Sequence, residues 1–185
     1  MTFDELMEDE THQSCVAKYM QYFRTLYDTR ARSQGMKDVK AKYATANLKP
    51  WQDALLDVVK GPVCDRKVYW YNDARGNTGK SWMAGYLMAH QGAVCFTNGK
   101  LADIACAYNY EPIVIFDLSR TQADKIDHVY MAIENFKNGR IFSPKYNSHT
   151  KLLNPPHVIV FANFVDDEDT RLKKLSEDRW MVMTM

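Results

Sequence analysis

The sequence is poor in the features that mark membrane, secreted and strongly basic proteins. No apolar run approaches the length of about 18 residues that crosses a bilayer, and the acidic N-terminus carries neither a secretory nor a transit signal. These absences predict a soluble intracellular protein with no membrane partner. The net charge is only +1, so any binding of nucleic acid must depend on a local basic patch.

Cysteine is also sparse, and its spacing does not suit a metal site. The four cysteines lie far apart in the chain, at Cys15, Cys64, Cys95 and Cys106. None of them forms a pair with metal-ligand spacing. We therefore expect reduced thiols packed in a core.

Apolar residues, in contrast, are plentiful enough for a full core. They make up 46% of the 185 residues, which predicts one domain of ordinary size with a small appendage. From Lys67 onward, short apolar runs alternate with helical patterns, and this alternation predicts an α/β fold with a mainly parallel central sheet. The expected strands are Lys67–Tyr71, Ala93–Phe96, Ile113–Leu118, Val158–Ala162 and Trp180–Thr184.

Two helices and a hairpin complete this part of the chain. Helical spacing of apolar residues runs from Ile126 to Phe136. Pro50 suits the first position of another helix, which Gly61 ends. The segment 140–153 does not fit a simple crossover, and its turn residues predict a hairpin inserted before the fourth strand.

Residues 1–47 differ in character from the rest. Their apolar positions repeat at intervals of three and four, which indicates an amphipathic helix; these positions are Val16, Tyr19, Met20, Phe23, Leu26 and Tyr27. A second short helix is expected over Met36–Ala44, after Gly35. The segment is too small to bury a core alone, so we expect it to pack on a neighbour, such as the same segment of another subunit.

A phosphate-binding loop follows the first predicted strand. Its residues are Ala74, Arg75, Gly76, Asn77, Thr78, Gly79, Lys80 and Ser81. Glycines let the backbone close around phosphate oxygens, Lys80 can reach the β and γ phosphates, and the Ser81 hydroxyl can hold Mg²⁺. Ala74 stands where the signature has its first glycine, which gives up easy access to positive φ. The loop predicts nucleotide binding.

Three other polar side chains mark the ends or starts of strands. Asp117 ends the third strand and can hold the water shell of Mg²⁺; alternatively it caps the next helix. Asn163 follows the fourth strand and can orient water or sense a γ-phosphate, or simply form a turn. Arg179 precedes the last strand and can reach a neighbour's γ-phosphate, or form a surface ion pair with Glu177 or Asp178.

The predicted hairpin carries a small set of candidate nucleic-acid contacts. Lys145, His149 and Lys151 place positive or titratable groups near its turn, and Tyr146 can stack on a base. The alternative is that these are ordinary solvated charges of a turn.

In order and spacing, these motifs resemble the superfamily 3 helicase domain of replication initiator (Rep) proteins from circular single-stranded DNA viruses. The similarity begins at Leu48 and reaches the C-terminus. It includes LKPWQ, the phosphate loop, FDLSR, the Lys145-Tyr146 pair, VIVFAN and LSEDRW. The form with FDLSR and ENFKNG looks closest to initiators of nanovirus-like and related unclassified agents.

The resemblance implies an AAA+-type P-loop ATPase domain over residues 48–185, preceded by a helical oligomerisation segment over residues 1–47. It implies a homo-oligomeric ring, expected to be a hexamer, that uses ATP and Mg²⁺ to move 3′ to 5′ on single-stranded DNA. Such a motor would act in rolling-circle replication, in the nucleus of the infected cell.

The same resemblance assigns roles to individual residues. Lys80 and Ser81 would bind nucleotide and magnesium, and Asp117 would be the magnesium acid. Asn163 would be the sensor, and Arg179 would be the finger donated to the next subunit. The hairpin that carries Lys145 would point into the central pore of the ring and grip the DNA backbone.

The sequence departs from the pattern of that family in two ways. Many relatives have two adjacent acids at the end of the third strand, whereas Leu118 follows Asp117 here. Asp117 then serves as both ligand and base, or Glu134 on the next helix turns inward. The His-x-His and Tyr-x-x-Lys motifs of the nicking domain are also absent, so we expect a C-terminal portion of a longer initiator.

Two other functions remain open from the sequence. A P-loop small-molecule kinase would use the same loop in a closed monomer. An oligomeric ATP-binding scaffold would hold ATP with little turnover, as the Leu118 substitution allows.

Overall fold

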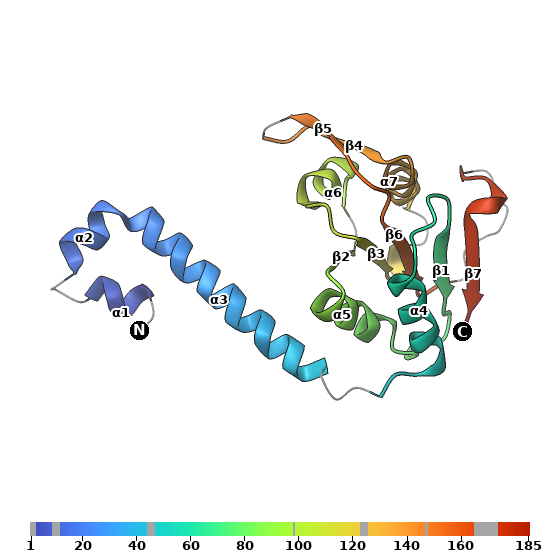
Figure 1. Cartoon of the computed structure of the whole chain (residues 1–185), viewed down its shortest axis with the longest axis horizontal. Helices are drawn as coiled ribbons and strands as arrows, with labels where there is room; N and C mark the ends of the chain where they lie inside the picture. Colours follow the sequence, from blue (N-terminus) through green and yellow to red (C-terminus); the bar gives the residue numbers. More distant parts are fainter. Residues whose placement is uncertain are drawn as a thin grey trace. The chain divides into compact units, whose positions relative to one another are not determined.

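The computed structural model describes residues 3–8, 12–43, 47–97, 99–122, 126–146, 148–164 and 174–185. The chain divides into two compact units, Met1–Ala46 and Asn47–Met185, shown in Figure 1. None of the described helices is long and apolar enough to cross a membrane.

The described residues of the first unit form the helices α1 (Phe3–Glu8), α2 (Gln13–Lys18) and α3 (Met20–Tyr43). The side chains of Leu6 and Val16 are buried within the unit. No residue of α3 is buried, so its predicted role in packing between subunits stays a prediction.

The predicted break after Gly35 is wrong, because α3 runs through this residue without interruption. A glycine inside a helix costs only about 1 kcal/mol relative to alanine. A side-chain hydrogen bond from Gln34 Nε2 to Asp38 Oδ1, at 3.0 Å, spans the position and supports the helix there.

The second unit contains a five-stranded sheet in the order β2-β3-β6-β1-β7. All of its neighbouring strands pair in parallel, which confirms the predicted α/β fold with a parallel central sheet. The strands are β1 (Val68–Asn72), β2 (Ala93–Phe96), β3 (Ile113–Leu118), β6 (His157–Ala162) and β7 (Trp180–Thr184). All six residues of β6 are buried, as expected for a central strand covered on both faces.

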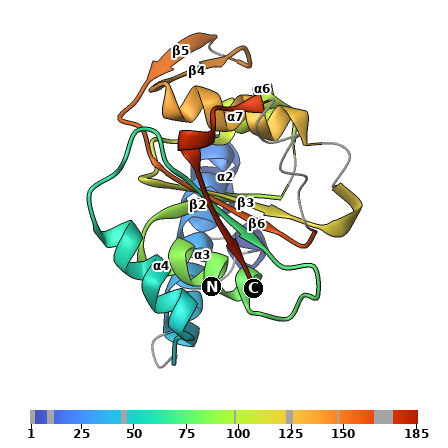
Figure 2. The same cartoon turned by 90° about the vertical axis from the view of Figure 1, so that its right-hand side faces the viewer.

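Helices cover both faces of this sheet (Figure 2). On one face, α4 (Pro50–Lys60) and α5 (Lys80–His90) pack against the sheet side chains of that face, such as Tyr71 and Ile159. On the other, α6 (Leu101–Ala107) and α7 (Asp127–Lys137) pack against side chains such as Trp70 and Val160. The alternation along β1 and β6 follows from the two-residue period of a strand. Helix α6 was not anticipated from the sequence.

The predicted hairpin is present. Strands β4 (Arg140–Ser143) and β5 (His149–Leu152) pair antiparallel, with Arg140 opposite Leu152 and Ser143 opposite His149. They form a sheet of their own between α7 and β6.

The sheet register determines which functional side chains can meet. Asn72 of β1 and Leu118 of β3 both lie beside Ala162 of β6. The carboxyl ends of these three adjacent strands therefore share one edge of the sheet, where ligands bind in open parallel α/β folds.

Candidate functional site

The phosphate loop joins β1 to α5 at this edge. Gly76, Asn77 and Gly79 adopt positive φ, with values of 82°, 64° and 95°. Ala74 does not, so the departure from the signature at this position introduces no backbone strain. Gly79 is the residue before α5, and the loop thus delivers its amides to the helix N-terminus, where a phosphate is favoured.

Lys80 lies inside the loop and not in solvent. Its side chain is 3% exposed, and its Nζ donates to Asp73 Oδ2 at 2.6 Å. Asp73 is fully buried and also accepts from the Gly76 amide at 2.7 Å and from Thr78 Oγ1 at 2.6 Å. Burial alone raises the pKa of Asp73, but these hydrogen bonds outweigh it and hold the pKa well below its ordinary value. The sequence analysis missed this residue.

Ser81 and Asp117 form an oxygen pair beside the loop. Ser81 Oγ donates to Asp117 Oδ2 at 2.7 Å. A hydroxyl and a carboxylate are ligands that Mg²⁺ accepts when substrate phosphates and water complete its shell. The donor set therefore fits magnesium, and the loop amides with Lys80 fit the phosphates of a nucleotide.

Asn163 lies across from the loop. It follows β6, and its backbone N–H donates to the Leu118 carbonyl at 3.1 Å. This hydrogen bond links the ends of β6 and β3. A cavity of about 290 Å³ is lined by Asn77, Thr78, Gly79, Lys80, Ser81, Trp82 and Asn163. The structure thus brings Asn163 to the same cavity as Lys80 and Ser81.

Three further side chains hold the loop from outside. Lys49 Nζ donates to the Thr78 carbonyl at 2.9 Å, and Gln52 Nε2 donates to the Gly79 carbonyl at 3.3 Å. Arg120 Nη2 donates to the carbonyls of Ala74 and Arg75, both at 2.8 Å. The LKPWQ and FDLSR motifs therefore contribute residues that position the loop, in addition to Asp117 of FDLSR. Sequence spacing alone did not reveal this positioning role.

Arg179 lies at the opposite end of β1 from its own phosphate loop. Trp180, the next residue, pairs with Val68, whereas the loop begins beyond Asn72, which pairs with Thr184. At about 3.3 Å per residue, this register separates the two by roughly 13 Å along the strand. Within one chain, Arg179 therefore does not lie with the other predicted site residues at the phosphate loop.

The surroundings of Arg179 argue against the surface ion pair with Asp178. Arg66 takes the carboxylate of Asp178, with Nη2 to Oδ1 at 2.9 Å, and Arg66 and Ser176 lower the pKa of Asp178. Arg179 Nη1 is buried without a hydrogen-bond partner among the described residues. Nearby, burial lowers the pKa of Lys137 to about 8, and the charge of Arg179 contributes to that shift.

The carboxylate that would act as a second acid is not beside Asp117. Leu118 is 1% exposed and belongs to the core. Glu134 is exposed on α7 and lines a different cavity with Asp127, Tyr130, Met131 and Lys174. The structure does not bring Glu134 to the loop, because its helix turns Ile133 and not Glu134 to the core.

The hairpin presents only some of its predicted contacts to solvent. Tyr146 is 96% exposed, and His149 is exposed as well. Lys145 is half-exposed and pairs with Asp103 of α6, which raises the pKa of Lys145.

Lys151 corrects the sequence analysis, because it is only 8% exposed. Its Nζ donates to the carbonyls of Tyr108 and Cys106. Successive side chains of a strand point to opposite faces. In β5, Lys151 therefore points inward and the next residue, Leu152, points outward. Lys151 therefore anchors the hairpin and is not available to DNA.

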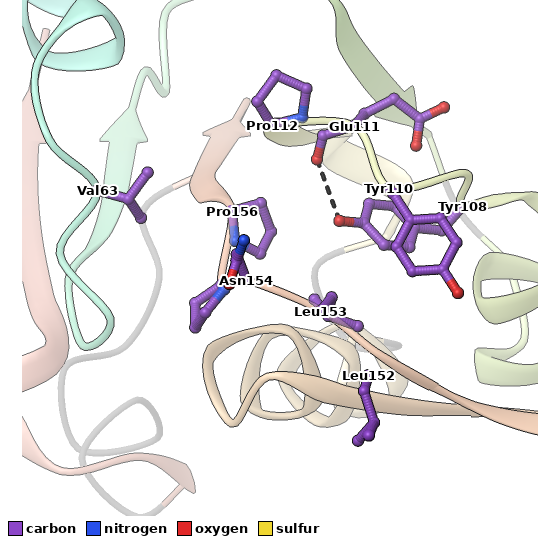
Figure 3. Close-up of a pocket in the computed structure, with 10 residues that line it drawn as sticks. Val63, Tyr108, Tyr110, Glu111, Pro112, Leu152, Leu153, Asn154 and Pro156 are labelled. Carbon is purple, nitrogen blue, oxygen red and sulfur yellow. Dashed lines mark hydrogen bonds between the residues drawn. The ribbon is translucent and has the colours of Figure 1, made fainter.

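Another cavity, of about 560 Å³, lies at the base of the hairpin (Figure 3). Its walls are the segment before β3, including Tyr110 and Pro112, and the segment from Leu152 to Pro156 before β6. These segments precede the amino ends of β3 and β6, so this cavity is at the opposite edge of the sheet from the phosphate loop.

Comparison with known proteins gives consistent relatives. The chain is 35% identical over 155 residues to the master replication protein of Banana bunchy top virus, a match that covers 84% of this chain and 51% of that protein. It is 36% identical over 134 residues to the master replication protein of Subterranean clover stunt virus, covering 72% and 44%. The Para-Rep C10 protein of Milk vetch dwarf C10 alphasatellite is 34% identical, covering 72% and 47%.

The chain spans about half the length of these relatives, and no protein-family model matches it. Among solved structures, a crystal structure of the JCV helicase with a small molecule bound aligns with 98% of this chain and 56% of its own. That alignment has 16% identity and a TM-score of 0.43. The resemblance to viral replication initiators is confirmed by the sequence relatives.

Proposed function

We infer that this chain, a homologue of nanovirus master replication proteins and alphasatellite Para-Rep proteins, is an ATP-driven motor on single-stranded DNA in viral DNA replication. The observation that carries the proposal is the convergence of Lys80, Ser81, Asp117 and Asn163 at one sheet edge. These are the groups that bind, polarise and sense a nucleoside triphosphate in P-loop ATPases.

Each residue of this edge has a defined task in the proposed reaction. Lys80 and the loop amides hold the phosphates in place, and Asn163 lies where it can orient the attacking water. Ser81 and Asp117 would hold Mg²⁺, which supplies charge stabilisation for the transferred phosphoryl group. Asp117 is then also the available acceptor for the water's proton, because Leu118 leaves no second carboxylate beside it.

A ring follows from the position of Arg179 in this proposal. An arginine that lies at the far end of the sheet cannot serve its own loop, but it can face the loop of an adjacent subunit. Head-to-tail contacts of this kind close into rings. We propose a hexamer that moves 3′ to 5′, as the family resemblance implies, acting in the host nucleus.

The rate of ATP hydrolysis with and without single-stranded DNA tests the proposed function. A motor should hydrolyse ATP slowly alone and several-fold faster with DNA, because DNA contacts on the hairpin are coupled to the site. A rate indifferent to DNA favours a small-molecule kinase. Binding of ATP without turnover favours the ATP-binding scaffold, for which the buried Leu118 beside Asp117 is the supporting observation.

Lys145 provides a test of the DNA contact. Lys145→Ala should weaken single-stranded DNA binding for all sequences, because the half-exposed ammonium meets phosphate and not bases. The slope of log affinity against log salt should flatten by about 0.7 for the lost phosphate contact. Basal ATP hydrolysis should persist without DNA stimulation.

The matched control for this variant is Lys60→Ala, which removes an exposed lysine from the end of α4. It should leave both the affinity and the salt slope unchanged. Fluorescence anisotropy of a labelled oligonucleotide at several salt concentrations measures both. Unaltered binding by Lys145→Ala would place the DNA elsewhere.

The N-terminal unit provides a test of assembly. Deletion of residues 1–47 should convert the oligomer into monomers at the same concentration, because α3 has no buried residue within the chain and exposes Met36 and Val39. Light scattering measures the mass before and after deletion. The second unit contains both core clusters, so its melting transition should remain, and an unchanged mass would contradict the prediction.

A further inference from the structure

Asp73 engages the donors of the phosphate loop with its own carboxylate. Its oxygens accept from the Lys80 ammonium, the Thr78 hydroxyl and the Gly76 amide, all within 2.7 Å. Loop amides and the loop lysine are also the groups that bind the phosphates of a nucleotide. The Asp73 carboxylate and a bound phosphate would therefore both need the Lys80 ammonium.

We propose that Asp73 competes with the nucleotide's phosphates for Lys80 and thereby sets how tightly the site holds nucleotide. The inference rests on the nucleotide binding proposed above. A negative charge at 2.6 Å neutralises the ammonium that should attract phosphate, and it repels the phosphate as well. Both effects are strong here because Lys80 and Asp73 are almost fully shielded from water.

The rest of the loop is built to tolerate the exchange. If Lys80 turns to a phosphate, the Asp73 carboxylate still has Thr78 Oγ1 and the Gly76 amide as donors. The Asp73 backbone is fixed by a hydrogen bond, which its backbone N–H donates to the Ala162 carbonyl at 2.9 Å. Arg120 and Lys49 hold the outside of the loop through separate carbonyls. A weaker hold on product also suits an enzyme that must release it in every cycle.

The test is Asp73→Asn in the full chain, which keeps the shape of the side chain and removes its charge. The dissociation constants of MgADP and of magnesium pyrophosphate, measured by calorimetry, should fall by about tenfold or more. Without nucleotide, the melting temperature should fall, because Lys80 is then a buried charge without its counter-ion. The rise in melting temperature on adding MgADP should exceed that of the parent protein.

Asp103→Asn is the matched control. It makes the same chemical change in a lysine–aspartate pair, with Lys145, that is half-exposed and joins α6 to the hairpin. Such exposed pairs contribute little to stability, so both the melting temperature and the affinity for MgADP should stay close to those of the parent.

Unchanged or weaker binding of MgADP by Asp73→Asn overturns the proposal, since Asp73 then assists the lysine and does not compete with it. Should the variant not fold, the parent protein gives a second measurement. The ¹³C chemical shift of the Asp73 carboxyl carbon should move when magnesium pyrophosphate is added, and no movement at saturation overturns the proposal equally. A parent protein that binds neither MgADP nor pyrophosphate would instead remove the proposed function.

Discussion

Replacement of Lys80 by alanine is expected to abolish ATP hydrolysis, with a rate below about one hundredth of the parental value. The expected size follows from the loss of a preorganised positive charge at the phosphates, an effect on the order of 10²–10³ for a single donor. A phosphate-release assay under saturating MgATP measures it. A variant that hydrolyses ATP at the parental rate would contradict the assignment of the phosphate loop.

The structure adds a complication that the variant must be designed around. Removal of Lys80 leaves Asp73 as a buried carboxylate without its ion partner, and breaking a buried pair costs about 3–5 kcal/mol. Lys80→Ala should therefore melt at a lower temperature than the parent. The double variant Lys80→Ala/Asp73→Asn removes the unpaired charge and should recover much of that stability.

Hydrolysis should remain absent in the double variant. Recovery of stability without recovery of activity separates a chemical role of Lys80 from a role in folding. Restored hydrolysis in the double variant would show that the lysine is needed only to neutralise Asp73.

The sheet could be predicted from sequence because its three central strands, β1, β3 and β6, are largely buried on both faces. Continuous apolar runs such as Ile113–Leu118 leave little choice of structure, and the observed bounds of β3 match the prediction. The hairpin was predictable for a similar reason, since a turn separates two short runs. The continuity of α3 through Gly35 was not predictable in this way. The tendency of a glycine to interrupt a helix is weaker there than the helical preference of the residues around it.

Helix α6 shows where periodicity fails. Its seven residues, Leu101–Ala107, make fewer than two turns, which is too short for a helical period to stand out. Its importance becomes visible only in three dimensions, where Asp103 pairs with Lys145 of the hairpin.

The site was predicted in its chain order but not in its contacts. The hydrogen bond from Ser81 to Asp117 joins two residues that the motifs had already predicted as magnesium ligands. Asp73 was missed because a site that binds phosphate is expected to carry positive charge, and a carboxylate beside it is not expected. Lys151 was misassigned because a lysine in a turn region is usually solvated, and only the strand register shows that it faces the carbonyls of Tyr108 and Cys106.

Loss of Arg179 is expected to leave ATP binding intact and to lower hydrolysis by about 10³-fold or more, as for arginine fingers elsewhere. Arg179→Ala removes no contact of its own phosphate loop, since β1 separates the two. Arg66→Ala is the matched control, because it removes an arginine from the same edge whose side-chain hydrogen bonds, among the described residues, go to Asp178 and Ser176. The control should bind and hydrolyse ATP at close to parental levels.

Mixing then decides whether Arg179 acts across a subunit boundary. Rings assembled from Arg179→Ala and Lys80→Ala/Asp73→Asn chains contain interfaces where an intact loop meets an intact arginine. With random assembly at equal amounts, roughly a quarter of the interfaces in a cyclic ring are complete in this way. Activity should therefore return in part, reach its maximum near equal mixing, and fall toward either pure variant.

An arginine that acts within its own chain predicts no recovery at any ratio, because each chain then lacks one essential group. Rescue requires exchange of subunits, so mixed assembly must be established separately, for example by energy transfer between differently labelled chains. Inactive rings that are shown to be mixed would remove the trans-acting arginine. Since Arg179 lies roughly 13 Å along the strand from its own loop, that outcome would also leave the arginine without a catalytic role and favour the ATP-binding scaffold over the motor.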